Sequence, residues 1–126
     1  MRAVTDGGEL AQRIDTIERG YEYLLAYAAQ GRQDDTGSEA RAVLTGMHAA
    51  LADLGLLARQ AVTAGGPDVG AWLDAVVRDA AVARGALALV LGRPRISSLL
   101  VDNLNASVHL RALLTDVFLL EQSLKG

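Results

Sequence analysis

The chain has 126 residues, of which 51% are hydrophobic, 21% charged and 4% aromatic, and its formal net charge is −3. This length and apolar content exclude a disordered chain and suit one domain with a real core. The acidic balance argues against nucleic acid as a partner, and the lack of cysteine excludes disulfides and thiolate metal ligands. No stretch reaches the roughly 18 uninterrupted apolar residues of a membrane span, and residues 1–8 lack the apolar run of a signal peptide. We therefore expect a cytoplasmic protein with no membrane partner.

The first predicted helix covers residues 9–30. Its apolar side chains recur at spacings of 4, 3, 4, 3 and 4 residues, the pattern of a helix that packs lengthwise against its neighbours. The positions in this series are Leu10, Ile14, Ile17, Tyr21, Leu24 and Ala28. Gly31 is a natural stop, and the polar residues that follow it predict a turn.

The second predicted helix covers residues 38–63 and begins at Ser38, whose hydroxyl can cap it. Its apolar series has the same spacing and consists of Ala40, Leu44, Met47, Leu51, Leu54 and Ala58. The third predicted helix covers residues 68–91, with Pro67 in a first-turn position, and the fourth covers residues 96–124 after a short break at Pro94.

These four helices and their short connections predict the fold. Each helix is roughly 33–44 Å long at 1.5 Å per residue, so consecutive helices must turn back on each other. We therefore predict an all-α fold in which residues 1–126 form a single domain, an antiparallel up-down-up-down four-helix bundle.

Several apolar side chains fall away from the core-facing series when residues are placed at 100° steps. Tyr23 and Tyr27 lie one turn apart on the first helix, and Val82 and Leu89 lie off the main face of the third, as Leu56 does on the second. Contiguous exposed apolar patches tend to be contact sites, and tyrosine is favoured in interfaces. We predict that Tyr23, Tyr27, Val82 and Leu89 bind a partner; the alternative is that they are ordinary isolated surface hydrophobes.

A polar segment, residues 102–109, interrupts the apolar fourth helix. Three of its residues share an outward face with Asp116 and are predicted to be exposed to solvent: Asp102, Asn105 and His109. Asn103 and Ser107 fall on the apolar side and are predicted to be buried. Since a buried amide without a partner costs roughly 1–3 kcal/mol, they form either a polar layer that fixes helix register or, with Trp72, the lining of a pocket for a small apolar ligand.

The stretch from Arg41 to His48 has the form R-x6-H and resembles the R-x4–6-H signature of HEPN-type helical ribonucleases, in which an arginine and a histidine act together on an RNA phosphate. The resemblance covers eight residues and one spacing, and Ala42 stands where those motifs usually carry a polar residue. It implies ribonuclease activity by Arg41 and His48; the alternative is a solvated helix edge.

A di-metal carboxylate bundle would need a glutamate three residues before a histidine. Neither His48 nor His109 has one, so we predict no metal and no cofactor.

The surface of the predicted bundle, rather than any catalytic motif, suggests the function. We predict a non-enzymatic interaction, regulatory or adaptor module that self-associates, most simply as a homodimer because closed twofold symmetry is common. Another protein is a further possible partner. The two alternatives are the small-molecule pocket near Trp72, Asn103 and Ser107, and the ribonuclease based on Arg41 and His48.

Overall fold

The computed structural model describes residues 8–62 and 66–125, and over these residues the fold is all-helical, as predicted. Six helices are found there: α1 (Glu9–Ala28), α2 (Ala40–Ala52), α3 (Leu54–Ala61), α4 (Pro67–Leu91), α5 (Ser98–Ala106) and α6 (His109–Lys125). The prediction of four uninterrupted helices is therefore wrong. The predicted range 38–63 holds both α2 and α3, with residue 63 outside the described part, and the predicted range 96–124 holds both α5 and α6.

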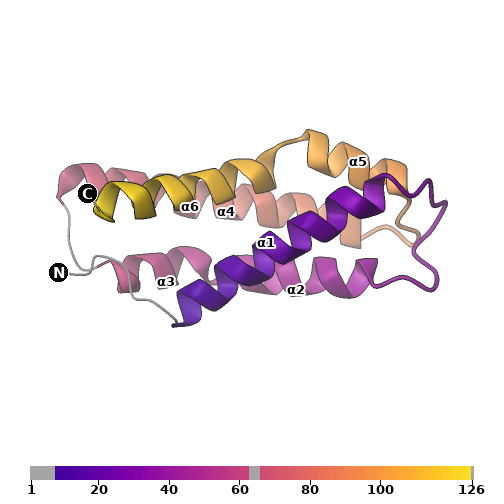
Figure 1. Ribbon diagram of the computed structural model, residues 1–126, viewed down its shortest axis with the longest axis horizontal. Coiled ribbons are helices and arrows are strands. Elements are labelled where there is room, and N and C mark those ends of the chain that lie inside the picture. The colour runs from indigo at the N-terminus through magenta and orange to yellow at the C-terminus, as the bar shows by residue number, and fades with distance from the viewer. Residues whose placement is uncertain (1–7, 63–65, 126) are drawn as a thin grey trace.

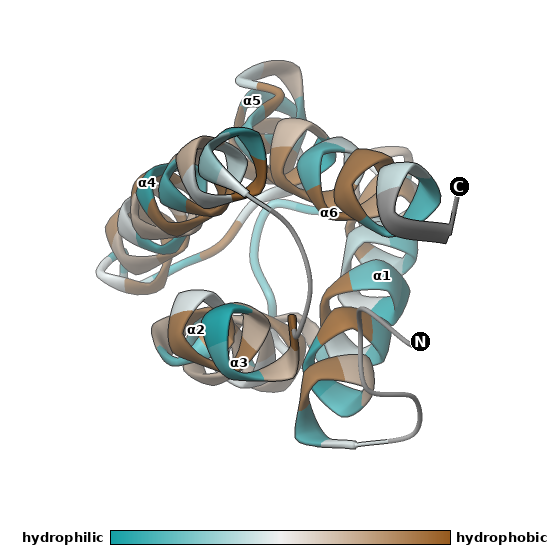
Figure 2. Cartoon of the chain, turned by 90° about the vertical axis from the view of Figure 1, so that its left-hand side faces the viewer, coloured by the Kyte–Doolittle hydropathy of each residue, from teal (hydrophilic) through white to brown (hydrophobic). Residues whose placement is uncertain are grey.

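The helices enclose one continuous core. Both α1 and α4 pack against α2, α3, α5 and α6. Figure 1 shows α2 and α3 end to end along one side, α4 and α6 along the opposite side, and α1 crossing obliquely in front of them. Viewed along the helices in Figure 2, α4 lies at one margin of this arrangement.

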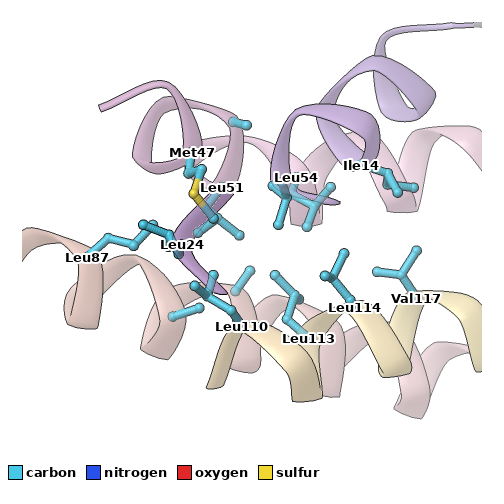
Figure 3. Packing of buried hydrophobic residues seen from close by; sticks show 14 of the residues in the cluster. Ile14, Leu24, Met47, Leu51, Leu54, Leu87, Leu110, Leu113, Leu114 and Val117 are labelled. Atoms are coloured by element: carbon cyan, nitrogen blue, oxygen red, sulfur yellow. The ribbon is translucent and has the colours of Figure 1, made fainter. Parts of the chain in front are cut away.

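Leucine, valine, isoleucine and alanine fill most of this core, as the low aromatic content requires. Figure 3 shows side chains from facing helices pointing toward one another across it, among them Leu24, Leu51 and Leu113. Glycine permits close approaches between helices, one of them between α3 and α4. A Cβ placed on Gly55 of α3 would lie 2.6 Å from Cγ2 of Val77 on α4, which is too close for an alanine without movement.

The second predicted helix is interrupted at Asp53. The guanidinium of Arg13 on α1 donates from Nε to Asp53 Oδ1 at 3.1 Å and from Nη2 to Oδ2 at 3.3 Å. Asp53 adopts φ −118° and ψ 7°, outside helical geometry, and its main-chain carbonyl accepts from the amide of Leu57 at the start of α3. A forked Arg–carboxylate pair of this kind is geometrically demanding, so we infer that it fixes the bend between α2 and α3 relative to α1.

The fourth predicted helix is interrupted at Val108. Its φ of 59° is left-handed, a conformation found most often in glycine at the end of a helix. The amide of Val108 donates to the carbonyl of Asn105, and the amide of Ala112 donates to the carbonyl of Val108, so α6 begins at once. A β-branched side chain in this conformation is strained, and no residue of the usual helix-ending type marks the place.

No helix in the described residues is both long and apolar enough to cross a membrane.

Replacing Val108 with glycine should stabilise the fold. The left-handed conformation costs an L-residue about 1–2 kcal/mol, while the 46% exposed Val108 side chain contributes little burial. Since glycine also loses more entropy on folding, we expect a net gain of about 0.5–1 kcal/mol in unfolding free energy. Urea unfolding followed by circular dichroism measures it.

Ala112→Gly, at an exposed position within α6, is the control and should destabilise by about 1 kcal/mol. Destabilisation of similar size in both variants would show that Val108 is not strained.

Candidate functional site

The outward face of α4 carries a second apolar stripe. At 100° per residue, six positions spaced by 4, 3, 4, 3 and 4 residues lie along one line of this helix. They are Ala71, Ala75, Arg78, Val82, Gly85 and Leu89, which we call the outer stripe of α4. Leu89 is 76% exposed and Val82 is 43% exposed, in agreement with the prediction that both lie off the core. Ala75, at one edge of the stripe, is buried.

The core-facing positions of α4 lie on the opposite side of the helix. They follow the same spacing and include Leu73, Val76, Ala80, Ala83, Leu87 and Val90, all of which are buried. The apolar requirement of the core is therefore met without the outer stripe. The core covers one apolar side of α4, and the second apolar side is left uncovered by this chain.

Other exposed apolar side chains are found elsewhere. Leu56 on α3 is 59% exposed, as expected from the sequence. On α6, Phe118 and Leu119 are 42% and 54% exposed, and neither was predicted from the sequence to lie on the surface. On α5, Leu99 is 70% exposed. On α4, by contrast, the exposed Val82 and Leu89 belong to a series in which five of six positions are small or apolar and the sixth is Arg78.

Tyr23 and Tyr27 do not form the exposed surface that the predicted partner contact requires. Tyr27 is fully buried, and Tyr23 is half-buried and packs against the core beside it, with ring centroids 6.0 Å apart. The Tyr27 hydroxyl donates to the carbonyl of Ile96 at 2.6 Å and lies 3.2 Å from the carbonyl of Asp34. A helical wheel reflects only packing between helices, whereas this end of α1 is also covered by the connections that follow α1 and α4.

Polar bonds join those two connections around Tyr27. The hydroxyl of Ser98 donates to the Tyr27 carbonyl at 2.7 Å and accepts from the amide of Arg32 at 2.9 Å. The Asp35 carboxylate accepts from the amide of Ile96 at 2.9 Å, and this hydrogen bond keeps the pKa of Asp35 below its usual value. The backbone groups of both connections are thus paired at the end of α1.

Tyr27→Phe should be markedly destabilising, because it removes the donor to a buried carbonyl. We expect a loss of about 1–3 kcal/mol in the free energy of unfolding, measured by urea titration. Tyr23→Phe is the matched control and should change it by less than about 0.5 kcal/mol. Equal and small effects of the two variants would restore the view that both rings belong to the surface.

Arg41 and His48 both lie on α2, but the arginine is engaged in structural bonds. Its Nη1 donates to the carbonyl of Leu91 at 3.0 Å, its Nη2 to the carbonyl of Arg93 at 2.9 Å, and its Nε to Asp35 at 3.2 Å. A guanidinium that ties α2 to the end of α4 in this way is poorly placed to hold a phosphate. The geometry therefore gives no support to the ribonuclease interpretation.

The residues of the predicted ligand pocket are not brought together as expected. Asn103 is exposed, which corrects the prediction that it is buried; it lies on the outer side of α5. Ser107 is half-buried and its hydroxyl donates to the carbonyl of Leu104 at 2.6 Å. The indole of Trp72 instead donates to the carbonyl of Asp116 on α6 at 3.0 Å. The break at Val108 shifts the register on which the burial prediction rested.

A hollow of about 160 Å³ lies elsewhere, between the start of α1 and the end of α3. Leu10, Leu57 and Ala61 line it together with Gly8, Glu9 and Gln60. None of the residues of the predicted pocket lines it.

The predicted solvated face of the fourth helix holds only in part. Asp102 and His109 are exposed, but Asn105 and Asp116 are half-buried. Asn105 donates from Nδ2 to the carbonyl of Leu24 on α1 at 3.2 Å. Asp116 has one carboxylate oxygen shielded from solvent without a hydrogen-bond partner. Burial, together with the neighbouring carboxyl of Asp79 on α4, raises the pKa of Asp116 to about 7.

This raised pKa predicts a pH-dependent stability. The unfolded chain releases the Asp116 proton near pH 4, whereas the folded protein holds it up to about pH 7. Stability should therefore fall as the pH rises from about 4 to 7 and level off above that value. Because Asp116 is only half-buried, we expect a loss on the order of 2 kcal/mol between pH 5 and pH 8.

Urea unfolding at pH 5 and pH 8 measures this dependence, and Asp116→Asn should remove most of it. Asp102→Asn, a change at an exposed acid of the neighbouring helix, should leave the dependence as it is in the unmodified chain. The prediction is contradicted if Asp116→Asn and Asp102→Asn behave alike.

No family of known proteins, no characterised protein and no solved structure matches this chain. Within the described residues, no three His, Asp or Glu side chains are grouped closely enough to hold a metal ion.

Proposed function

We propose that this protein is a non-enzymatic interaction module that self-associates through the outer stripe of α4. The observation that carries the proposal is the apolar series on the side of α4 opposite the core, in which Leu89 is 76% and Val82 is 43% exposed. Burying a Val or Leu side chain contributes about 1.5–3 kcal/mol relative to leaving it exposed. A partner that covers this stripe therefore gains free energy that the single chain forgoes.

The small residues of the stripe support a helix as the covering element. Ala71 and Gly85 are both exposed and leave the backbone of α4 approachable. The distance between two packed helices is set by the side chains at their contact. A second helix can thus approach α4 closely and pack against Val82 and Leu89 at the same time.

We also propose that the six helices act as four antiparallel rods of a single domain, with α2 continued by α3 and α5 continued by α6. Both pairs are separated by one or two residues only. Such a domain would offer α4, a helix of 25 residues, to a partner. We place the protein in the cytoplasm, since a cysteine-free chain does not depend on an oxidising compartment.

The double variant Val82→Glu with Leu89→Glu tests the proposal. We expect the unmodified chain to be a dimer by light scattering on a size-exclusion column, and the double variant to be a monomer, because paired carboxylates cannot be buried in an apolar contact. Both positions are exposed in the single chain, so its circular dichroism spectrum should not change.

Leu56→Glu is the control, because Leu56 is an exposed leucine on α3, outside the outer stripe, and this variant should remain a dimer. A monomeric unmodified chain, or a double variant with unchanged mass, would refute the proposal.

A further inference from the structure

Two acidic side chains meet in the contact between α4 and α6. Both Asp79 on α4 and Asp116 on α6 are half-buried, and their carboxyl groups lie within hydrogen-bonding reach of each other. One oxygen of Asp116 is shielded from solvent and finds no donor among the described residues. Because an ionised carboxyl group only accepts hydrogen bonds, these two groups can bond to each other only when one of them carries a proton.

No basic side chain lies one turn from either acid. The positions three and four residues away from Asp79 and Asp116 are all uncharged, and they are Ala75, Val76, Val82, Ala83, Ala112, Leu113, Leu119 and Leu120. Arg78 on α4 favours the charged form of Asp116, but its side chain is exposed and its effect is the smallest of those that act on this acid. Two further helices, α1 and α5, pack against α6, and neither supplies a charged group that shifts the pKa of Asp116. The contact is therefore balanced by a proton rather than by a cation.

Asp116 is bonded to α4 at two points. Its main-chain carbonyl accepts from the indole Nε1 of Trp72 at 3.0 Å, and its side chain meets Asp79. Trp72 and Asp79 are seven residues apart and thus lie on the same side of α4. Since α4 begins at the end of the molecule where α6 finishes (Figure 1), the two helices run in opposite directions. The side chain of Asp116 tilts toward the start of its helix and its carbonyl points toward the end, so the two contacts hold this residue from both sides.

We propose that Asp79 and Asp116 share one proton in the folded protein, and that loss of this proton loosens α6 from α4 while the helices before Val108 stay packed. Without the proton, two negative charges face each other in a half-buried contact, where their repulsion is stronger than in water. The helix α6 can respond alone because the left-handed backbone of Val108 separates it from α5. Burial, together with Asp79, places the pKa of Asp116 at about 7, so the change would occur around neutral pH.

The loosening is an increase in how often α6 opens, not a permanent release. The helix buries five apolar side chains against the core, and the repulsion of one charge pair is smaller than their combined hydrophobic contribution. These side chains are Leu110, Leu113, Leu114, Val117 and Leu120. The packed arrangement therefore remains the main one above pH 7, and the quantity that changes is the small fraction of molecules in which α6 is open.

Hydrogen–deuterium exchange measures this fraction. It is recorded at pH 5 and pH 8 by mass spectrometry of peptides from α6 and α2, with correction for the intrinsic pH dependence of amide exchange. The most protected amides of α6 should exchange on the order of tenfold faster at pH 8 than at pH 5. At pH 8 they should also exchange roughly tenfold or more faster than the most protected amides of α2. Equal protection of the two helices at pH 8 would show that only the whole chain opens, and a pH-independent α6 would show that the proton does not hold it; either result overturns the proposal.

Asp116→Asn supplies a permanent donor, because its side-chain amide can donate to the Asp79 carboxylate. This variant should lose most of the pH effect on the exchange of α6. Glu121→Gln, a neutral change at another half-buried acid of the same helix, is the matched control and should keep the effect. If the α6 peptides of both variants respond to pH in the same way, the acid pair is not what holds the helix.

Carbon NMR of the aspartate carboxyl groups tests the shared proton directly. In the unmodified chain, the signals of Asp79 and Asp116 should both follow a titration step near pH 7, because a shared proton belongs to the pair. In Asp116→Asn that step should be absent from the signal of Asp79. Separate titration of both acids near pH 4, the ordinary range for aspartate, would mean that no proton is shared and would overturn the proposal.

Discussion

The end of α1 is tied to the connection before α5 by hydrogen bonds, and the positions of the other helices depend on this joint. Tyr27 reaches Ile96 through its hydroxyl, and its carbonyl receives the hydroxyl of Ser98. Buried backbone groups must be paired wherever a chain leaves a helix, and here two irregular segments far apart in sequence pair with each other. These hydrogen bonds thus pair backbone groups of both connections, and they set where α5 begins relative to α1.

Arg41 extends this joint to α4. Its guanidinium spans Asp35 in the connection after α1 and the carbonyls of Leu91 and Arg93 at the end of α4. Because these acceptors are main-chain carbonyls at the end of a helix, they would otherwise need water or another donor. The hydrogen bonds from Arg41 on α2 therefore hold the end of α4 in place. The outer stripe faces away from the core because the opposite side of α4 packs into it. A rigid element of this kind presents a contact surface at little entropic cost.

The sequence predicts those features that depend on periodicity alone. The apolar series placed α1 and α4 correctly to within a few residues and separated the core stripe of α4 from Val82 and Leu89. It failed where a tertiary contact outweighs local preference. Nothing in the sequence near Asp53 indicates that Arg13 holds it, and Val108 occupies a conformation usually reserved for glycine. The burial of Tyr27 required knowledge of the connections, which no helical wheel contains.

The side of α4 that faces α6 is separate from the outer stripe, and this separation decides whether self-association is compatible with the fold. Trp72 and Asp79 lie on the α6 side, where they meet Asp116. By helix geometry these positions are about 80–100° away from the line of Ala71 and Leu89. A second copy that covers the outer stripe therefore need not displace α6. Since α6 buries its own apolar residues against the core, the contact between copies would add to the fold instead of competing with it.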